Sequence, residues 1–159
     1  MEHHTIQMAD RKRIALISHD ALKADLLDWV DYNKDFLAEH ELFATGTTGE
    51  MIQMKLDLDV TCLQSGPLGG DAQISAMIAQ GEIDIVIFFF DPMGVHPHEY
   101  DIKALLRIAA VFNVPIACNR STADFILSSE LMWSDYQRIV ADYAGEREKD
   151  TFSIIDEVN

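Results

Sequence analysis

The chain has 159 residues, and its fold is limited first by the segment 83–90, IDIVIFFF, which is apolar almost throughout. A strand with one face in water alternates apolar and polar residues, and this segment does not alternate. A continuous apolar run is typical of a strand buried on both faces, in a parallel sheet that helices cover on each side. The segment therefore predicts an α/β protein with this strand in the middle of its sheet.

Short apolar segments and segments with helical spacing alternate along the rest of the chain. Because parallel neighbours need a crossover, five such units predict a three-layer, doubly wound, five-stranded parallel sheet of the Rossmann-like kind. We expect one domain over residues 1–159, with a core at about 13–143, a polar N-terminal tail and an acidic C-terminal tail. A further helix is predicted around 132–143. The predicted strands are 13–18, 41–45, 60–64, 83–90 and 114–117, and the predicted helices are 23–37, 49–55, 71–81, 101–112 and 122–127.

Acidic residues outnumber basic ones by 27 to 12, which gives a formal net charge of -15. The chain lacks the clustered Lys and Arg of a nucleic-acid binder, and an anionic membrane surface would repel it. The N-terminal segment is polar, and no apolar run reaches the roughly 20 residues of a membrane span, so we expect a cytoplasmic protein. Cys62 and Cys118 lie in apolar runs and are expected to be buried thiols.

Polar and glycine-rich clusters follow the first four predicted strands. In a doubly wound sheet, ligands bind at the carboxyl ends of the strands, where the connecting loops gather. We therefore expect all four clusters to share one edge of the sheet and to form the binding site there. The clusters are 19–20 (HD), 45–49 (TGTTG), 65–71 (SGPLGGD) and 91–101.

The threonine- and glycine-rich cluster admits two interpretations. Thr47 followed by Glu50 has the spacing of a capping box, which would only start a helix. Alternatively, small residues at a helix N-terminus expose backbone N–H groups that hold a phosphate, with Ser65 and Gly66 as a second wall. Lys23 would supply the positive charge, although taken alone it is typical of a solvated helix lysine. The spacing fits neither a Walker P-loop nor a dinucleotide GxGxxG motif, which disfavours nucleotide cofactors.

Asp71 precedes a predicted helix, where an aspartate is a preferred N-cap. The carboxylates expected near Asp71 favour another interpretation. Four carboxylates would meet at one edge of the sheet and raise one another's pKa values into a range useful for proton transfer. These carboxylates are Asp20, Asp71, Asp91 and Asp101. Proton transfer by a member of this carboxylate group is thus the alternative to capping.

His96 and His98 flank a proline and resemble a metal-binding pair. The proline opposes joint chelation, and the usual Cys or Glu ligand is missing at zinc spacing, so we expect no metal. A neutral His98 that donates a hydrogen bond to a carbonyl oxygen is the favoured interpretation. The other histidines outside the first loop are expected in the N-terminal tail (His3, His4) and at a helix end on the surface (His40).

Six motifs occur in an order and spacing that resemble the methylglyoxal synthase family. They are HDxxK at 19–23, ATGTTG at 44–49, SGPLGGD at 65–71, FFFDP at 88–92, PHEYDIKALLR at 97–107 and STADF at 121–125. The resemblance runs from about residue 13 to 143 and implies a methylglyoxal synthase-like fold, usually assembled as a homohexamer. It implies conversion of dihydroxyacetone phosphate to methylglyoxal and inorganic phosphate, a glycolytic bypass that needs no cofactor or metal.

The resemblance also implies a role for each site residue. Asp71 would be the general base that forms an enediolate, and His98 would polarise the carbonyl. Asp101 belongs to the same catalytic group, and together with Asp20 and Asp91 it would orient the histidines and tune Asp71. The grip on the phosphate would set the angle of the breaking C–O bond. The residues that would bind the substrate are His19, Lys23, Thr45, Gly46, Thr47, Thr48, Ser65, Gly66 and His98.

Two other classes of protein stay open at this point. The same fold serves as a non-catalytic regulatory ligand-binding domain, as in carbamoyl phosphate synthetase, which would keep the phosphate loops without the acid–base residues. A phosphoacceptor receiver domain would carry a lysine after the fifth strand, where this chain has Asn119 and Arg120. The resemblance also implies subunit contacts around Arg138, through which that residue could reach a neighbour's site and inorganic phosphate could inhibit.

Overall fold

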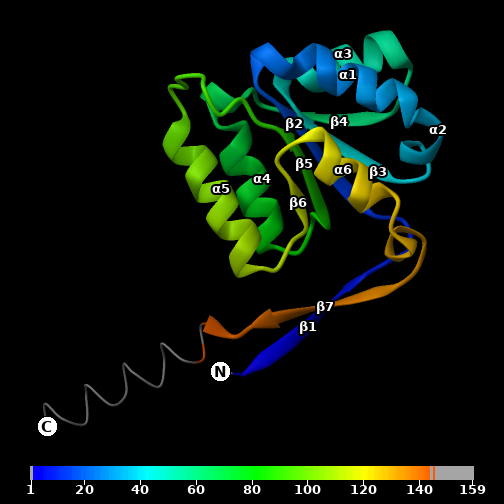
Figure 1. Cartoon of the computed structure of the whole chain (residues 1–159). Helices are drawn as coiled ribbons and strands as arrows, with labels where there is room; N and C mark the ends of the chain where they lie inside the picture. The colour runs from blue at the N-terminus through cyan, green and yellow to red at the C-terminus, as the bar shows by residue number, and fades with distance from the viewer. Residues whose placement is uncertain (1, 144, 146–159) are drawn as a thin grey trace, which may run out of the picture.

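The computed structural model describes residues 2–143 and 145. Its centre is a five-stranded parallel sheet in the order β4-β3-β2-β5-β6 (Figure 1). β2 lies in the middle and pairs in parallel with β3 on one side and β5 on the other. The predicted fold class is confirmed. The strands are β2 (Arg13–Ser18), β3 (Glu41–Thr45), β4 (Val60–Leu63), β5 (Ile85–Phe89) and β6 (Ile116–Ala117).

Helices cover both faces of this sheet (Figure 1). One face carries α1 (Lys23–Tyr32), α3 (Gly46–Leu56) and α6 (Arg120–Leu127), and the other carries α4 (Gly70–Ala79) and α5 (Glu99–Val111). The short helix α2 (Lys34–Leu37) follows α1. Within the part of the chain that the structure describes, no helix combines the length and apolar character needed to cross a membrane.

The apolar run of β5 is explained by two separate cores. Ile85 and Ile87 pack into the core beneath α1, α3 and α6, whereas Val86 and Phe88 pack into the core beneath α4 and α5. Successive residues of a strand point to opposite faces, so a strand between two cores needs apolar side chains at every position.

Two predicted helices differ from the structure by more than two residues at one end. α3 begins at Gly46, so the whole TGTTG cluster after Thr45 belongs to the helix. The predicted helix 23–37 is divided at Asn33, whose side chain donates a hydrogen bond to the Trp29 carbonyl. The predicted acidic tail lies beyond Gly145, outside the described residues.

The two ends of the described chain pair with each other. β1 (His3–Met8) and β7 (Tyr136–Ala141) form an antiparallel ribbon that projects from the main sheet (Figure 1). The predicted helix around 132–143 is therefore wrong. Arg138 and Val140 are buried while the residues between and beside them are exposed or half-buried, a period of two that fits a strand once β1 supplies the partner. His3 and His4, expected in a tail, belong to β1 but are exposed.

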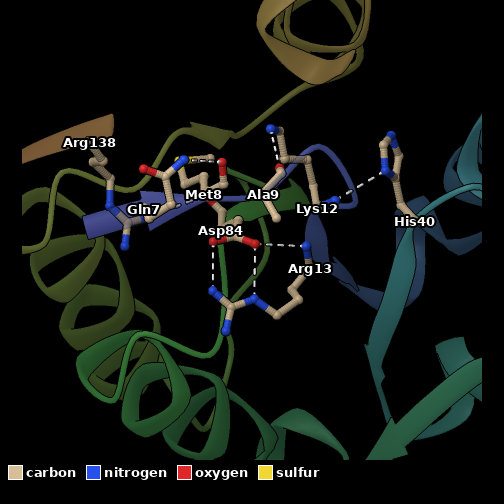
Figure 2. Close-up of polar contacts among 8 residues, drawn as sticks. All are labelled: Gln7, Met8, Ala9, Lys12, Arg13, His40, Asp84 and Arg138. Atoms are coloured by element: carbon tan, nitrogen blue, oxygen red, sulfur yellow. Dashed lines mark hydrogen bonds and ion pairs between the residues drawn. The ribbon is translucent and has the colours of Figure 1, made fainter. Parts of the chain in front are cut away.

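A buried polar cluster joins this ribbon to the amino ends of the central strands (Figure 2). Asp84 lies just before β5 and accepts hydrogen bonds from the Arg13 backbone N–H at 2.9 Å and from the Arg13 guanidinium at 2.9 and 2.8 Å. Arg138 is fully buried, and its Nη1 donates to the Asp84 backbone carbonyl at 3.5 Å. Arg138 therefore points into its own chain, and the expectation that it reaches a neighbour's site is wrong.

Two predictions about the exposure of side chains are also wrong. His40 is only 4 % exposed, because its Nδ1 accepts a hydrogen bond from the Lys12 backbone N–H at 3.2 Å (Figure 2) and its ring packs beside Phe36 and Trp133. Cys62 is exposed rather than buried, because β4 is an edge strand whose side chains lack a neighbouring strand on one side. Cys118 is half-buried.

Candidate active site

A pocket of about 470 Å³ opens at the edge of the sheet where β2, β3, β4 and β5 end. Its walls come from all four polar clusters, so the structure brings these clusters together at one edge. Gly46 lies behind the wall against Ser65, and Asp101 is exposed and lies outside the lining. The predicted site residues in the lining are His19, Asp20, Lys23, Thr45, Thr47, Thr48, Ser65, Gly66, Asp71, Asp91 and His98.

The N-terminus of α3 forms one wall of this pocket. Thr45 is its N-cap and makes no side-chain capping hydrogen bond, and Thr47 lies inside the helix, so the capping-box interpretation is wrong. The first N–H groups of a helix have no acceptor within it, which leaves them free for an anion. Gly46 has φ +34°, and a Cβ there would lie 2.7 Å from the Cα of Ser65, so only glycine lets the two loops touch. This arrangement favours the phosphate interpretation.

Lys23 is directed to the same helix end. Its Nζ donates hydrogen bonds to Asp20 Oδ1 at 2.5 Å and to Thr47 Oγ1 at 2.6 Å. The hydrogen bond from Lys23 lowers the pKa of Asp20. The ammonium group and the positive end of the α3 dipole therefore act on the same point of the pocket, where they attract an anion together.

Asp71 is buried in the first turn of α4, with no exposed surface. Gly69 is the N-cap of α4, so Asp71 is not the capping residue. Its Oδ2 lies 2.6 Å from His98 Nδ1. Burial raises the pKa of Asp71, the hydrogen bond and charge of His98 lower it, and the charge of Asp101 raises it again. A carboxylate with raised proton affinity, held by one imidazole, suits a general base.

Asp101 and Asp91 act through other groups. The Asp101 backbone N–H donates to the His98 carbonyl at 3.0 Å, in the first turn of α5, while its side chain is exposed. Asp91 Oδ1 accepts hydrogen bonds from the backbone N–H groups of Met93 and Gly94 at 3.0 and 3.1 Å. Asp91 therefore shapes the loop that follows β5, and Asp101 influences Asp71 by charge.

His19 follows β2, and a backbone N–H donates a hydrogen bond to its imidazole ring. Its Nδ1 accepts the Asp91 N–H at 2.9 Å, so the proton of the neutral ring lies on Nε2. That Nε2 is buried and has no hydrogen-bond partner among residues 2–143 and 145. Burial, followed by the charges of His96 and His98, lowers the pKa of His19 to about 4. His19 is therefore neutral at physiological pH, and it has one N–H to donate.

The sequence placed His96 in the loop 91–101 and singled it out individually only as half of a possible metal pair, whereas its contact with His19 is a feature that only the structure reveals. Its ring stacks on His19 with centroids 3.6 Å apart and planes 21° from parallel. The HPH motif was the available signal, but ring stacking across two loops is not visible in sequence. The lining residues that lie outside the four predicted clusters, other than Lys23, are Ile17, Ser18 and Ala21.

His19, His96 and His98 each offer a ring nitrogen, and these nitrogens lie within 4.8 Å of one another. A zinc ion needs its nitrogen ligands at about 2.1 Å, with their in-plane lone pairs converging on it. The stacked rings of His19 and His96 hold their lone pairs side by side. The Nδ1 of His19 is also occupied by the Asp91 N–H, which leaves a protonated Nε2. The donor set therefore does not suit a metal ion in this arrangement.

Known proteins resemble the chain over nearly its whole length. The family model of the MGS-like domain matches residues 25–118. Methylglyoxal synthases of Yersinia pestis (strain Pestoides F) and Yersinia pseudotuberculosis serotype O:1b (strain IP 31758) are 53% identical over 143 residues, which is 90% of this chain and 93% of each relative. The crystal structure of methylglyoxal synthase from Elizabethkingia anophelis NUHP1 has a TM-score of 0.85 and 50% identity, covering 90% of this chain and 94% of that chain.

Proposed function

The chain belongs to the methylglyoxal synthase family and is a lyase that forms methylglyoxal, and we propose that its substrate is dihydroxyacetone phosphate. In this proposal it is a carbon–oxygen lyase that releases inorganic phosphate and uses no cofactor. A regulatory domain or a receiver domain is disfavoured, because the relatives are synthases matched over 93% of their length. The pocket also combines an anion site with acid–base groups.

The contact between Asp71 and His98 is the observation that carries this proposal. The two side chains meet at 2.6 Å in the same pocket that Lys23 and the N-terminus of α3 line. A phosphate held at the helix end would place the rest of a three-carbon substrate toward the carboxylate. The site thus offers an anion clamp and a base at opposite ends of a small ligand.

The first step is removal of a proton from the hydroxymethyl carbon next to the carbonyl. An Asp71 carboxylate oxygen takes this proton, and the C–H electron pair forms a C=C bond while the carbonyl electrons move to oxygen. The product is an enediolate. Its negative charge needs a hydrogen-bond donor at the former carbonyl oxygen.

The hydrogen bonds of the two histidines favour His19 as that donor. Neutral His19 carries its proton on Nε2, because Nδ1 accepts from the Asp91 N–H. A neutral His98 that donates from Nδ1 to an ionised Asp71 has a lone pair on Nε2 and accepts there instead. In this arrangement His98 binds the substrate hydroxyl and steers Asp71, while His19 polarises the carbonyl.

The second step is loss of phosphate. The hydroxyl proton first passes to the former carbonyl oxygen, so that the negative charge lies on the oxygen of the deprotonated carbon. That oxygen forms a C=O bond, the C=C pair shifts to the bond between the second and third carbons, and the bond between the third carbon and its phosphate oxygen breaks. Inorganic phosphate leaves with this electron pair and with the proton that Asp71 took up, and the remaining enol of methylglyoxal ketonises. The breaking bond must stand perpendicular to the enediolate plane, so that its orbital overlaps the π system. We assign this angle to the grip of Lys23, Thr47, Ser65 and their neighbours on the phosphate.

An assay of purified protein pretreated with a chelator tests the proposal. Wild type is expected to convert dihydroxyacetone phosphate to equal amounts of methylglyoxal and phosphate. Asp71→Asn removes the base and should lower kcat by about 10² to 10⁴. Asp59→Asn is the matched control, because Asp59 is an exposed carboxylate before β4, at the opposite end of that strand from the pocket.

Three results would contradict parts of this scheme. If wild type forms no methylglyoxal, dihydroxyacetone phosphate is not the substrate. Equal rates for wild type and Asp71→Asn would remove Asp71 as the base. Activity lost on chelation and restored by zinc would reinstate a metal at the three histidines.

The same proposal includes an oligomeric state, a cellular location and a metabolic role, each of which rests on the family resemblance. We propose a cytoplasmic homohexamer that diverts triose phosphate around lower glycolysis and is inhibited by inorganic phosphate across subunits. Large apolar side chains that would suit subunit contacts are exposed at Tyr32, Val95 and Phe125. Sedimentation would measure the oligomer, and sigmoidal kinetics in added phosphate would measure the inhibition.

A further inference from the structure

We propose that His96 is a positioning residue, which stacks on His19 and holds it as a neutral N–H donor to the substrate oxygen. The inference rests on the proposed reaction and names a residue that the reaction scheme has not used. His96 is half-buried and belongs to the loop between β5 and α5. Its role follows from what surrounds the His19 ring.

The His19 ring is held by contacts of two kinds. The hydrogen bond from Asp91 N–H to Nδ1 fixes which nitrogen carries the proton. Aromatic rings surround the rest: Phe88 meets it edge-on at 5.0 Å and Phe90 lies at 5.3 Å. His96 is the stacked neighbour at 3.6 Å, so it covers a flat face of the imidazole. Without that cover, water would reach the face of the ring.

The loop is built to bring His96 to this position. Asp91 Oδ1 accepts the N–H groups of Met93 and Gly94 and so turns the chain back after β5. A Cβ at Gly94 would lie 2.7 Å from His96 Nε2 and 2.5 Å from Asp91 Oδ2. A side chain at position 94 would therefore displace the His96 ring or the Asp91 carboxylate where the loop folds His96 toward the pocket. Pro97 follows and restricts the backbone before His98.

The charge of His96 and the burial of His19 both lower the pKa of His19. The pKa of His19 lies at about 4 because of burial first, then the charge of His96 and that of His98, whereas the carboxylates of Asp91 and Asp20 act in the opposite sense. A protonated His19 would keep Nε2–H but would gain a second proton on Nδ1, which now accepts from Asp91. Keeping His19 neutral therefore preserves the hydrogen bond that orients it.

Two substitutions of His96 separate the effect of the stacked ring from the effect of the imidazole charge. His96→Ala removes the stacked ring, and we expect the pKa of His19, measured by NMR of ¹⁵N-histidine-labelled protein, to rise. We expect kcat to fall by about 10- to 100-fold through misorientation of the donor. KM should change little, because the phosphate clamp is untouched. His96→Phe keeps an aromatic face, so its kcat should stay close to wild type and its His19 pKa should rise less.

Met93→Ala is the matched control, because Met93 belongs to the same loop, is 90 % exposed and does not line the pocket. The inference is overturned if His96→Ala leaves both kcat and the His19 pKa unchanged, or if His96→Phe is as impaired as His96→Ala. The His19 titration needs no turnover. A wild type that fails to make methylglyoxal would thus refute the proposed function while leaving the stacking role measurable.

Discussion

Burial and a neighbouring carboxylate raise the pKa of Asp71, whereas one imidazole lowers it. The first and largest influence on its pKa is burial, which raises it, and the hydrogen bond from His98 lowers it. Asp101 raises the pKa of Asp71 by charge, although its own side chain is exposed and outside the pocket lining. Asp101 therefore contributes to the site at a distance, by making the base hold its proton more tightly.

Replacing Asp101 by Asn should move the acid limb of the pH–rate profile. Ionised Asp71 is the active form, so kcat/KM falls as the pH drops through its pKa. Asp101→Asn removes a negative charge, favours ionised Asp71 and lowers that pKa, so the limb should move to lower pH. Glu99→Gln in the same helical turn is the control, because Glu99 does not act on Asp71. A limb at unchanged or higher pH would show that Asp101 does not tune the base.

At the scale of elements, the site depends on how closely α4 approaches the end of β4. Gly70 begins α4 and is buried, and a Cβ there would collide with the carbonyl oxygen of Gln64. Asp71 is the next residue. The close approach of helix and loop therefore sets where the carboxylate lies relative to His98.

Gly70→Ala should displace the start of α4 and separate Asp71 from His98. Overpacking of this kind costs about 1 to 3 kcal/mol of unfolding free energy, measured by urea titration, and kcat should fall with it. Ala76→Gly is the control: it lies on the exposed face of the same helix and should cost about 1 kcal/mol without loss of kcat. A fully active Gly70→Ala protein would show that the approach is not needed.

Across the whole molecule, one buried residue links three strands through its carboxylate and its backbone carbonyl. Asp84 lies before β5 and binds Arg13 at the start of β2 through three hydrogen bonds (Figure 2). Its backbone carbonyl accepts a hydrogen bond from Arg138 of β7. The cluster lies at the amino ends of these strands, opposite the pocket. It therefore couples the β1–β7 ribbon to the main sheet without touching the active site.

Asp84→Asn should lower the unfolding free energy by about 2 kcal/mol, because it weakens charge-assisted hydrogen bonds to a buried carboxylate and leaves the half-buried Arg13 without its counter-charge. Activity of the folded fraction should be retained. Glu99→Gln breaks the exposed Glu99–Lys103 pair, at 2.8 Å, and should change stability by about 0 to 1 kcal/mol. Similar small losses in both variants, measured by urea unfolding, would refute an anchoring role for Asp84.

Much of the fold was predictable because its signals are local. The strand 13–18 and the strand 41–45 were predicted with their observed ends, and the run 83–90 contains β5. Chain order then places the carboxyl ends of these strands, and hence the polar loops, at one edge. Residues such as Thr47, Ser65 and Asp71 could be assigned to a common pocket for that reason, since each follows a strand.

The amino-acid sequence alone determined the alternation of strands and helices, the shared edge and the family, because these follow from periodicity, chain order and motif spacing. Tertiary structure alone decided the pairing of β1 with β7, the burial of Arg138 and the stacking of His96 on His19. Each of these joins segments that are far apart in the chain or in different loops. Such contacts depend on where the whole fold places two side chains, and no short window of sequence encodes that placement.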